Sequence, residues 1–549
     1  MQYEFSGRGR SGSSSGSSNV LAMLCLAFLL AVLSGSASAA ACAGAGATSD
    51  VACTDLGAVR GSVENGTLAF KGIPYAKPPV GDLRWRAPQP AVAWSGTREA
   101  VRYAPMCPQI IGGHVEGSED CLYLNVWRPV QKPKHLLPVM VWLHGGGNQS
   151  YSGAGDPGFG GVVYDGEKLV PQGVIFVSYS LRVGVLGFLA HPALDAERPE
   201  KISGNYGSQD QIAMLQWLHR NIAAFGGDPS KMFLFGTSAG GGNICALLTS
   251  PMTKGLIHGV SMQSSVPTGC EIPTLADVER GTGRAVAAKT GCDSSSDVAA
   301  CLRGKTVSEI VSAVPAPPFN VFSRVYGPNM DGHVFVDQPL ALIKQHKYPA
   351  VPIIIGNTAG ETMHFIDAVG PVTDAASFAG AVKKVFGAGP ADRIVAQYPL
   401  DQYPTPRAAF VQLTTDGEFT CQSRRVARTF ASVQSEPVFR YVFNHTLEND
   451  PEQKALGPTH TAEHPYFFSW KGTYKPTPTD LDIQKHMISY WSRMAKTGNP
   501  NGGNDPFWPN ASALNAAYLE IGTDTQSKSG EGEAHCDFWD TVQLPWPHL

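Results

Sequence analysis

The sequence predicts an α/β protein with a mostly parallel central sheet and helices on both faces of the sheet. Residues 139–143, 174–179 and 232–235 are continuous apolar runs, which are typical of strands buried on both faces of a parallel sheet. Residues 210–222 carry apolar side chains at helical spacing, and residues 239–249 are expected to form the next helix. Strand and helix thus alternate over about 110 residues, which indicates βαβ connections.

The rest of the chain extends this sheet. Residues 119–127 alternate polar and apolar side chains, as a strand does, and the segment around them reads as antiparallel edge structure with loops. The alternation weakens between about 265 and 350, where we expect an insertion that covers the site. Further elements are expected at residues 351–356, 439–443 and 517–521, as strands, and at 481–497, as an amphipathic helix.

Composition limits the possible functions. Of the 549 residues, 43% are hydrophobic and 16% are charged, which describes a globular protein. A net charge of -4 gives no electrostatic reason to expect a nucleic-acid partner. The chain has no Cys-x-x-Cys pair, so we predict no zinc site, and we predict no other metal or cofactor. Without a separable linker or internal repeat, residues 40–549 are predicted to form a single domain.

Residues 1–39 have the layout of a secretory signal peptide. Arg8 and Arg10 precede an apolar run at 20–33, and small residues follow it up to Ala39. The run is short for a bilayer span, so we expect no stable membrane span after processing, with an uncleaved anchor as the alternative. Lipidation at Cys42 is a further, less favoured possibility. The cysteines favour disulfides in an oxidising compartment, and hence a secreted protein, extracellular or periplasmic.

The pattern Gly-x-Ser-x-Gly occurs at residues 236–240 and makes Ser238 the candidate nucleophile. The same pattern at residues 12–16 follows no apolar strand, so only the match at residues 236–240 is taken as a candidate site. A serine hydroxyl needs an imidazole to accept its proton and a carboxylate to orient that imidazole. A second glycine run, at residues 144–147, also follows a buried strand. We expect the N–H groups of Gly146, Gly147 and Ala239 to form an oxyanion hole.

The acid and the histidine should follow the serine in the chain. Glu361 lies just beyond the buried strand 351–356 and is favoured over Asp331, which is typical of a turn. The pattern alone does not select the histidine, and His460 and its neighbour His464 are the two strongest candidates. The eligible histidines are His364, His445, His460, His464, His486, His535 and His548.

Several motifs together resemble the type-B carboxylesterase and cholinesterase family of α/β-hydrolases, from about Gly57 to Trp539. The matching segments are residues 119–126, 144–147, 216–229 and 235–241. The resemblance implies an α/β-hydrolase fold with large insertions over the active site. It also implies the acid Glu361, the histidine His460 with Glu463 three residues later, the oxyanion donors Gly146, Gly147 and Ala239, and Ser264 as a hydroxyl near the acid.

The same resemblance implies disulfides. The expected bridges are Cys107–Cys121, Cys292–Cys301 and Cys421–Cys536, with Cys42–Cys53 as an additional candidate. Cys245, on the helix after the candidate nucleophile, is expected to be a small buried residue.

Two departures from the family argue against a cholinesterase. Thr237 stands where many members have glutamate, and the short loop between Cys107 and Cys121 lacks a tryptophan for a cationic substrate. The predicted function is therefore a secreted serine carboxylic-ester hydrolase, which acts through an acyl-enzyme on a small-molecule ester and water. Alternatives are a lipase for long-chain esters and a non-catalytic adhesion or binding protein on the same fold. The sequence predicts neither the acyl and alcohol groups of the substrate nor the oligomeric state.

Overall fold

The structure is a computed structural model that describes residues 50–156, 161–265, 270–315, 325–470, 472–515, 517–530 and 533–542. The predicted signal segment 1–39 and Cys42 lie outside these ranges. The strands are β1 (Val51–Thr54), β2 (Gly57–Arg60), β3 (Ser62–Glu64), β4 (Thr67–Pro74), β5 (Thr97–Glu99), β6 (Gln109–Ile111), β7 (His114–Glu116), β8 (Tyr123–Pro129), β9 (Leu137–Leu143), β10 (Ile175–Tyr179), β11 (Gly227–Thr237), β12 (Gly259–Gln263), β13 (Ile353–Thr358), β14 (Val438–Asn444), β15 (Tyr518–Gly522) and β16 (Gln526–Lys528).

Helices connect and cover these strands. They are α2 (Gly184–Phe188), α3 (Pro192–Asp195), α4 (Tyr206–Asn221), α5 (Ala239–Thr249), α6 (Leu275–Val278), α7 (Arg284–Lys289), α8 (Val298–Gly304), α9 (Val307–Ala313), α10 (Pro339–Lys344), α11 (Ala375–Phe386), α12 (Ala388–Gln397), α13 (Pro406–Thr415), α14 (Cys421–Val433), α15 (Pro451–Leu456), α16 (His464–Phe467), α17 (Pro478–Thr497) and α18 (Glu533–Trp539). None of the helices in the described ranges is both long and apolar enough to cross a membrane.

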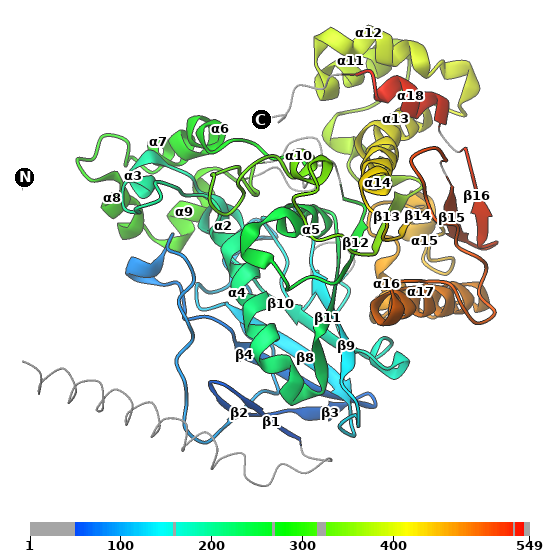
Figure 1. The fold of residues 1–549 in the computed structure, drawn as a ribbon. Coiled ribbons are helices and arrows are strands. Elements are labelled where there is room, and N and C mark those ends of the chain that lie inside the picture. The colour runs from blue at the N-terminus through cyan, green and yellow to red at the C-terminus, as the bar shows by residue number, and fades with distance from the viewer. Residues whose placement is uncertain are drawn as a thin grey trace, which may run out of the picture.

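One large sheet organises the molecule (Figure 1). Within the described residues it has eleven strands in the order β16-β15-β14-β13-β12-β11-β9-β10-β8-β4-β3. Neighbouring strands run parallel from β15 to β10, whereas β16 at one edge and β8, β4 and β3 at the other pair antiparallel. The predicted mostly parallel sheet, with antiparallel structure from the N-terminal segment, is confirmed.

The central strands are buried on both faces because their side chains alternate between two hydrophobic clusters. In β9, Val139 and Val141 pack into the first cluster with α4 and α5, whereas Met140 and Trp142 pack into the second. The second cluster includes the apolar side of α17, which lies across β9 and β11. A helical layer therefore covers each face of the sheet, as continuous apolar strands require.

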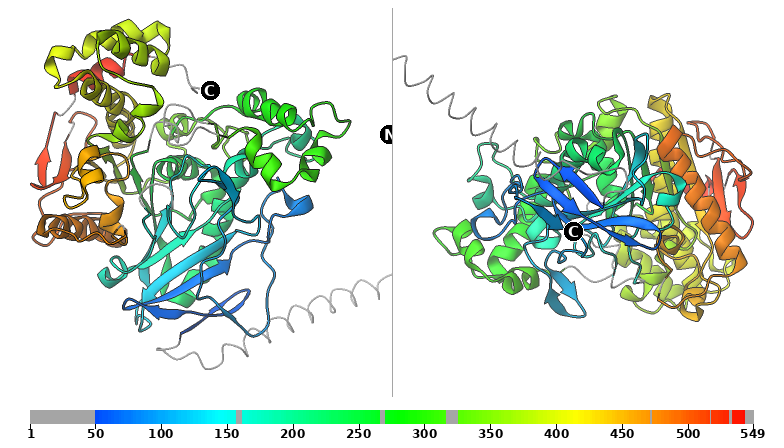
Figure 2. Two further views of the ribbon diagram at one scale, coloured as in Figure 1. Left: turned by 180° about the vertical axis from the view of Figure 1, so that it is seen from behind. Right: turned by 90° about the horizontal axis from the view of Figure 1, so that it is seen from below.

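A third cluster belongs to a helical group formed by α11, α12, α13 and α18. The group lies at one end of the molecule, next to α14, as Figure 1 and the left view of Figure 2 show. Its chain segments come from far apart in the sequence, since α18 follows α13 by more than one hundred residues. The Cys421–Cys536 disulfide joins the start of α14 to α18.

The structure contains four disulfides among its described residues. Three of them, Cys107–Cys121, Cys292–Cys301 and Cys421–Cys536, are the bridges that the resemblance implied. Cys53 is also disulfide-bonded, while its expected partner Cys42 is outside the described residues. Cys245 is buried as expected, but it also pairs with Cys270, a bridge that was not predicted. This bridge links α5 to the segment after β12, two parts of the chain that no local pattern connects.

Candidate active site

Ser238 occupies the sharp turn between β11 and α5. Its φ is 55° and its ψ is -125°, a backbone conformation that is rare outside glycine and typical of a strained, functional position. The Ser238 N–H donates to the carbonyl of Gln263 at 2.8 Å, which ties the turn to the end of β12. The half-buried serine therefore stands at the carboxyl end of the sheet and at the N-terminus of an eleven-residue helix.

Glycines allow the turn to sit against the strand beside it. A Cβ atom at Gly236 would lie 2.5 Å from the carbonyl oxygen of Leu143, and one at Gly240 would lie 2.1 Å from the same oxygen. Both contacts are with backbone, which cannot move aside easily. The first turn of α5 thus packs directly on the end of β9, and this packing explains the glycines on both sides of the serine.

The glycine loop after β9 lies beside the serine. A Cβ atom at Gly145 would be 3.1 Å from the Cβ of Ser238. Gly146 and Gly147 have φ values of 85° and 62°, in the left-handed region that favours glycine. The N–H groups of Gly146, Gly147 and Ala239 have no acceptor among the described residues. Three unpaired backbone donors next to one hydroxyl form a suitable environment for a developing negative charge.

Glu361 and His460 form a buried pair. The Nδ1 atom of His460 lies 2.5 Å from Oε2 of Glu361, and the glutamate side chain is fully buried. The other carboxylate oxygen, Oε1, accepts from the N–H of Thr358 at 2.7 Å. A carboxylate that accepts at both oxygens is fixed in direction, so it orients the imidazole and selects its tautomer.

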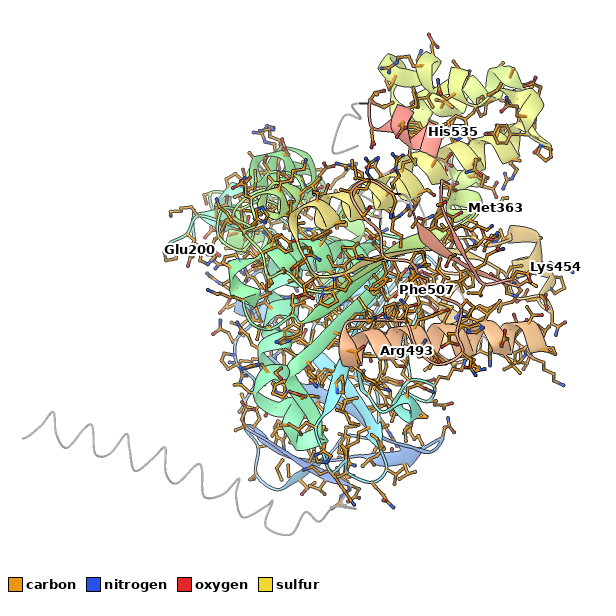
Figure 3. All side chains as sticks on the ribbon, turned by 45° about the vertical axis from the view of Figure 1, so that its right-hand side comes forward. Glu200, Met363, Lys454, Arg493, Phe507 and His535 are labelled. Carbon is orange, nitrogen blue, oxygen red and sulfur yellow. A yellow bond between two sulfur atoms is a disulfide. The ribbon has the colours of Figure 1, made fainter. Side chains whose placement is uncertain are left out.

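Two aromatic rings and the backbone hold His460 in place. The centroids of the Phe365 and Phe419 rings lie 5.3 and 5.5 Å from that of the imidazole. The His460 N–H donates to the Glu361 carbonyl at 3.2 Å, so the two loops are joined by backbone as well as by side chains. Met363, in the same 3-10 turn as Glu361, packs against the helical group (Figure 3).

Adjacent parallel strands bring the loops that carry Glu361 and His460 together at the carboxyl ends of the strands. Glu361 follows β13, and the loop that carries His460 follows β14, the next strand in the sheet. The loop after β13 also meets the loop after β14 at Gly360, whose N–H donates to the Pro458 carbonyl at 3.0 Å. Ser264, the predicted hydroxyl near the acid, follows β12 and is fully buried, and its N–H donates to the Gly356 carbonyl at 2.7 Å.

The alternative acid, Asp331, and most of the alternative histidines make contacts elsewhere in the fold. Asp331 accepts through Oδ1 from three consecutive backbone N–H groups, those of residues 333, 334 and 335, and through Oδ2 from the amide of Asn205. It therefore stabilises a turn. His464 is buried against the Trp142 ring, and its Nδ1 lies 3.4 Å from Asp156. Three other eligible histidines, His445, His486 and His535, pair with Asp480, Asp505 and Asp416.

Glu463, which the resemblance named without a role, is a second buried carboxyl near Glu361 and His460. Its side chain is fully buried, and neither carboxylate oxygen has a hydrogen-bond partner in the described part of the chain. Burial raises the pKa of Glu463, and the nearby Glu361 carboxylate raises it further, against the opposing influence of His464 and His460. Its only sequence signal is the His-x-x-Glu spacing from His460. Burial also lowers the pKa of His144 to about 4, so an uncharged ring precedes the glycine loop.

No cluster of side chains suited to a metal ion occurs among the described residues. The chemistry available at the site is that of a hydroxyl, an imidazole, a carboxylate and backbone N–H groups.

Comparisons with known proteins place the chain in a family. The model of the carboxylesterase family matches residues 48–539. The chain is 34% identical to fumonisin B1 esterase of Sphingopyxis macrogoltabida, over 83% of each chain. It is 33% identical to para-nitrobenzyl esterase of Bacillus subtilis (strain 168), over 83% of this chain and 91% of the relative. It is 32% identical to cholinesterase of Mus musculus, over 89% and 86%.

A solved structure agrees with these matches. The structure of PNB esterase superposes with a TM-score of 0.76 at 30% sequence identity, and the match covers 89% of this chain and 99% of that one. The predicted α/β-hydrolase fold and the predicted family are therefore confirmed. The chain belongs to the carboxylesterase family and is an ester hydrolase.

Proposed function

We propose that the protein hydrolyses carboxylic esters through an acyl-enzyme on Ser238, with His460 as general base and Glu361 as its orienting acid. The observation that carries this proposal is the buried 2.5 Å contact between His460 and Glu361, at the same edge of the sheet as the strained serine turn. A carboxylate that holds Nδ1 of a buried imidazole fixes the ring so that proton transfer takes place at the other nitrogen, Nε2.

In the first step, Ser238 Oγ attacks the ester carbonyl carbon while its proton passes to His460 Nε2. The C–O bond to the alcohol then breaks, and the imidazolium returns that proton to the leaving oxygen. In the second step, a water molecule gives a proton to His460 and attacks the acyl carbon, and the proton returns to Ser238 as the acid is released. Glu361 stabilises the imidazolium in both steps without itself becoming protonated.

The negative charge that forms on the carbonyl oxygen needs fixed donors. The unpaired N–H groups of Gly146, Gly147 and Ala239 are our candidates, and the positive end of the α5 dipole adds to their effect. Removal of one such donor typically costs about 3 kcal/mol of transition-state stabilisation.

The substrate that we propose is a small ester without a cationic alcohol group. Thr237, next to the nucleophile, is buried and uncharged, so it offers no anion to a quaternary ammonium. The relatives include a fumonisin B1 esterase and a para-nitrobenzyl esterase, and we infer that neutral aryl or alkyl esters are suitable probes.

We also propose that residues 1–39 are removed as a signal peptide and that residues 40–549 act as one secreted domain. The four disulfides support an oxidising location, since such bridges are rare where thiols are kept reduced.

The test is Ser238→Ala. This variant should fold normally and should lose p-nitrophenyl ester hydrolysis and covalent labelling by a fluorophosphonate probe, because the attacking oxygen is gone. Ser432→Ala, at an exposed position on α14, is the matched control and should keep both. Turnover retained by folded Ser238→Ala protein would contradict the proposed mechanism.

A further inference from the structure

The oxyanion donors come from two separate pieces of chain. Gly146 and Gly147 belong to the loop after β9, whereas Ala239 begins α5. The inference drawn here rests on the proposed function, since it concerns how these donors are aligned. Displacement of a catalytic group by about 1 Å can lower a rate roughly 100-fold, so the spacing between loop and helix has to be held by specific contacts.

The loop is well ordered internally. The N–H groups of Gln149 and Ser150 both donate to the carbonyl of Gly146, at 2.9 and 3.1 Å. Asn148 has a φ of 58° and so continues the left-handed conformation of the two glycines before it. Asparagine tolerates this conformation better than most residues with a side chain. These features fix the shape of the loop but not its position relative to α5.

One hydrogen bond joins the loop to the helix. The Nδ2 group of Asn243 donates to Oδ1 of Asn148 at 2.8 Å, and Asn243 is 3% exposed. Among the residues that the structure describes, this is the only hydrogen bond between residues 144–150 and α5. On its other side, Asn148 accepts through its carbonyl from the N–H of Gly184, at 2.6 Å, so the residue is held at two points.

The sequence of α5 explains why Asn243 makes this contact. Residues 240–242 are all glycine, so the first turn after Ala239 has no side chain that could reach the loop. Asn243 is the first residue beyond them, one helical turn after Ala239. Asparagine is a poor residue for a helix interior and costly to bury without a partner, which makes its paired amide a specific feature of this site.

We propose that Asn148 and Asn243 are positioning residues for ester hydrolysis. Their hydrogen bond sets the distance between the loop donors, Gly146 and Gly147, and the helix donor, Ala239. Neither side chain takes part in proton transfer or bond formation.

The experiment uses the full-length enzyme and the variants Asn243→Ala, Asn148→Gly and the double variant. Glycine at 148 removes the side chain without backbone strain, because it accepts the left-handed conformation. Each single variant should lower kcat for a p-nitrophenyl ester by roughly 10-fold to 100-fold with KM within about threefold, since the transition state and not the bound ester needs the aligned donors. The double variant should be no slower than the slower single variant, because both changes remove the same contact.

A transition-state mimic supplies a second measurement. Affinity for an alkyl trifluoromethyl ketone, which forms an oxyanion on Ser238, should fall in parallel with kcat/KM across the variants. Thr249→Val is the matched control. It removes a buried hydroxyl from the far end of the same helix, where Thr249 Oγ1 donates to the Ala246 carbonyl, and it should leave kcat unchanged.

Thermal unfolding identifies the folded variants. Unchanged kcat in folded Asn148→Gly protein, or additive losses in the double variant, would overturn the positioning role even if Asn243→Ala fails to fold. A failure of the proposed function gives a different result, because the unmodified enzyme itself would then show neither fluorophosphonate labelling nor ester hydrolysis.

Discussion

The two halves of the candidate site are built in different ways. Residues 143–150 and 236–242 contribute mainly backbone. At several of their glycines an added Cβ atom would lie less than 3 Å from a neighbouring atom, and three of their N–H groups have no acceptor among the described residues. Residues 361 and 460 act through side chains, which a buried 2.5 Å contact and two aromatic rings hold. The first half depends on the absence of side chains and the second on their identity, so substitutions should affect them by different physical mechanisms.

The largest effect is expected in the side-chain half. Glu361→Gln should lower kcat by roughly 1,000-fold to 10,000-fold, because an amide favours the wrong imidazole tautomer and cannot stabilise the imidazolium. Steady-state hydrolysis of a p-nitrophenyl ester measures the effect. Asp331→Asn is the comparison variant: it should cost about 1–2 kcal/mol of stability at its turn and leave kcat within about threefold. The reverse order would assign the acid to Asp331.

The backbone half should fail through packing. In Gly240→Ala, the new Cβ would lie 2.1 Å from the Leu143 carbonyl oxygen and 2.6 Å from that of His144. We expect activity to fall about 100-fold and stability by about 1–3 kcal/mol, as the elbow moves away from the glycine loop. Ester hydrolysis and thermal unfolding together measure this.

Gly380→Ala is the control for this variant. Gly380 lies in α11 with nothing within 4 Å of a new Cβ, so the change should leave activity intact and raise stability by about 0.5–1 kcal/mol. A neutral result at Gly240 would contradict the backbone argument.

The smallest effect concerns pH and Glu463. Because burial raises the pKa of this carboxyl above its unfolded value, the folded state binds the proton more tightly than the unfolded chain does. Its contribution to stability is therefore fully present below the ordinary glutamate pKa of about 4.3 and is lost as pH rises toward the folded pKa. Glu463→Gln should thus gain stability relative to the unmodified enzyme as pH rises from about 4.3, by at most about 1.4 kcal/mol per pH unit.

Chemical denaturation at several pH values measures this difference. Exposed Glu436→Gln is the control and should track the unmodified enzyme at every pH. A difference between Glu463→Gln and the unmodified enzyme that stays constant with pH would show that the buried carboxyl is not the titrating group.

The backbone half was easier to predict from sequence because glycine patterns are local. Residues 236–240 and 144–147 each follow a continuous apolar strand, and the structure places the ends of β11 and β9 side by side. Most strands of the large sheet were predicted to within a few residues, because an apolar run is also a local pattern. β12 was not predicted, since its five residues include Gly259, Ser261 and Gln263 and resemble a loop.

The side-chain half depends on contacts between distant residues. His460 and His464 lie four residues apart, and no periodicity in the sequence separates them. The family resemblance favoured His460, and the structure shows that this ring contacts Glu361 whereas His464 lies near Asp156. The Asn148–Asn243 contact spans 95 residues, and the partner of Cys245 lies beyond the next strand. Such pairs are set by how the helices pack on the sheet, which hydrophobic spacing alone does not determine.

The order of strands in the sheet affects how the chain can fold while it is synthesised from the N-terminus onward. From β11 onward, each new strand is the next neighbour outward: β12, β13, β14, β15 and β16 follow in turn. Each strand from β12 to β16 therefore finds the strand on which it pairs already made, and the outer edge of each stays unpaired until the next strand is made. The turn that carries Ser238 is made with β11, whereas Glu361 and His460 come only after β13 and β14. With the proposed mechanism, a chain that folds in this order gains hydrolase activity only after most of its length has been made.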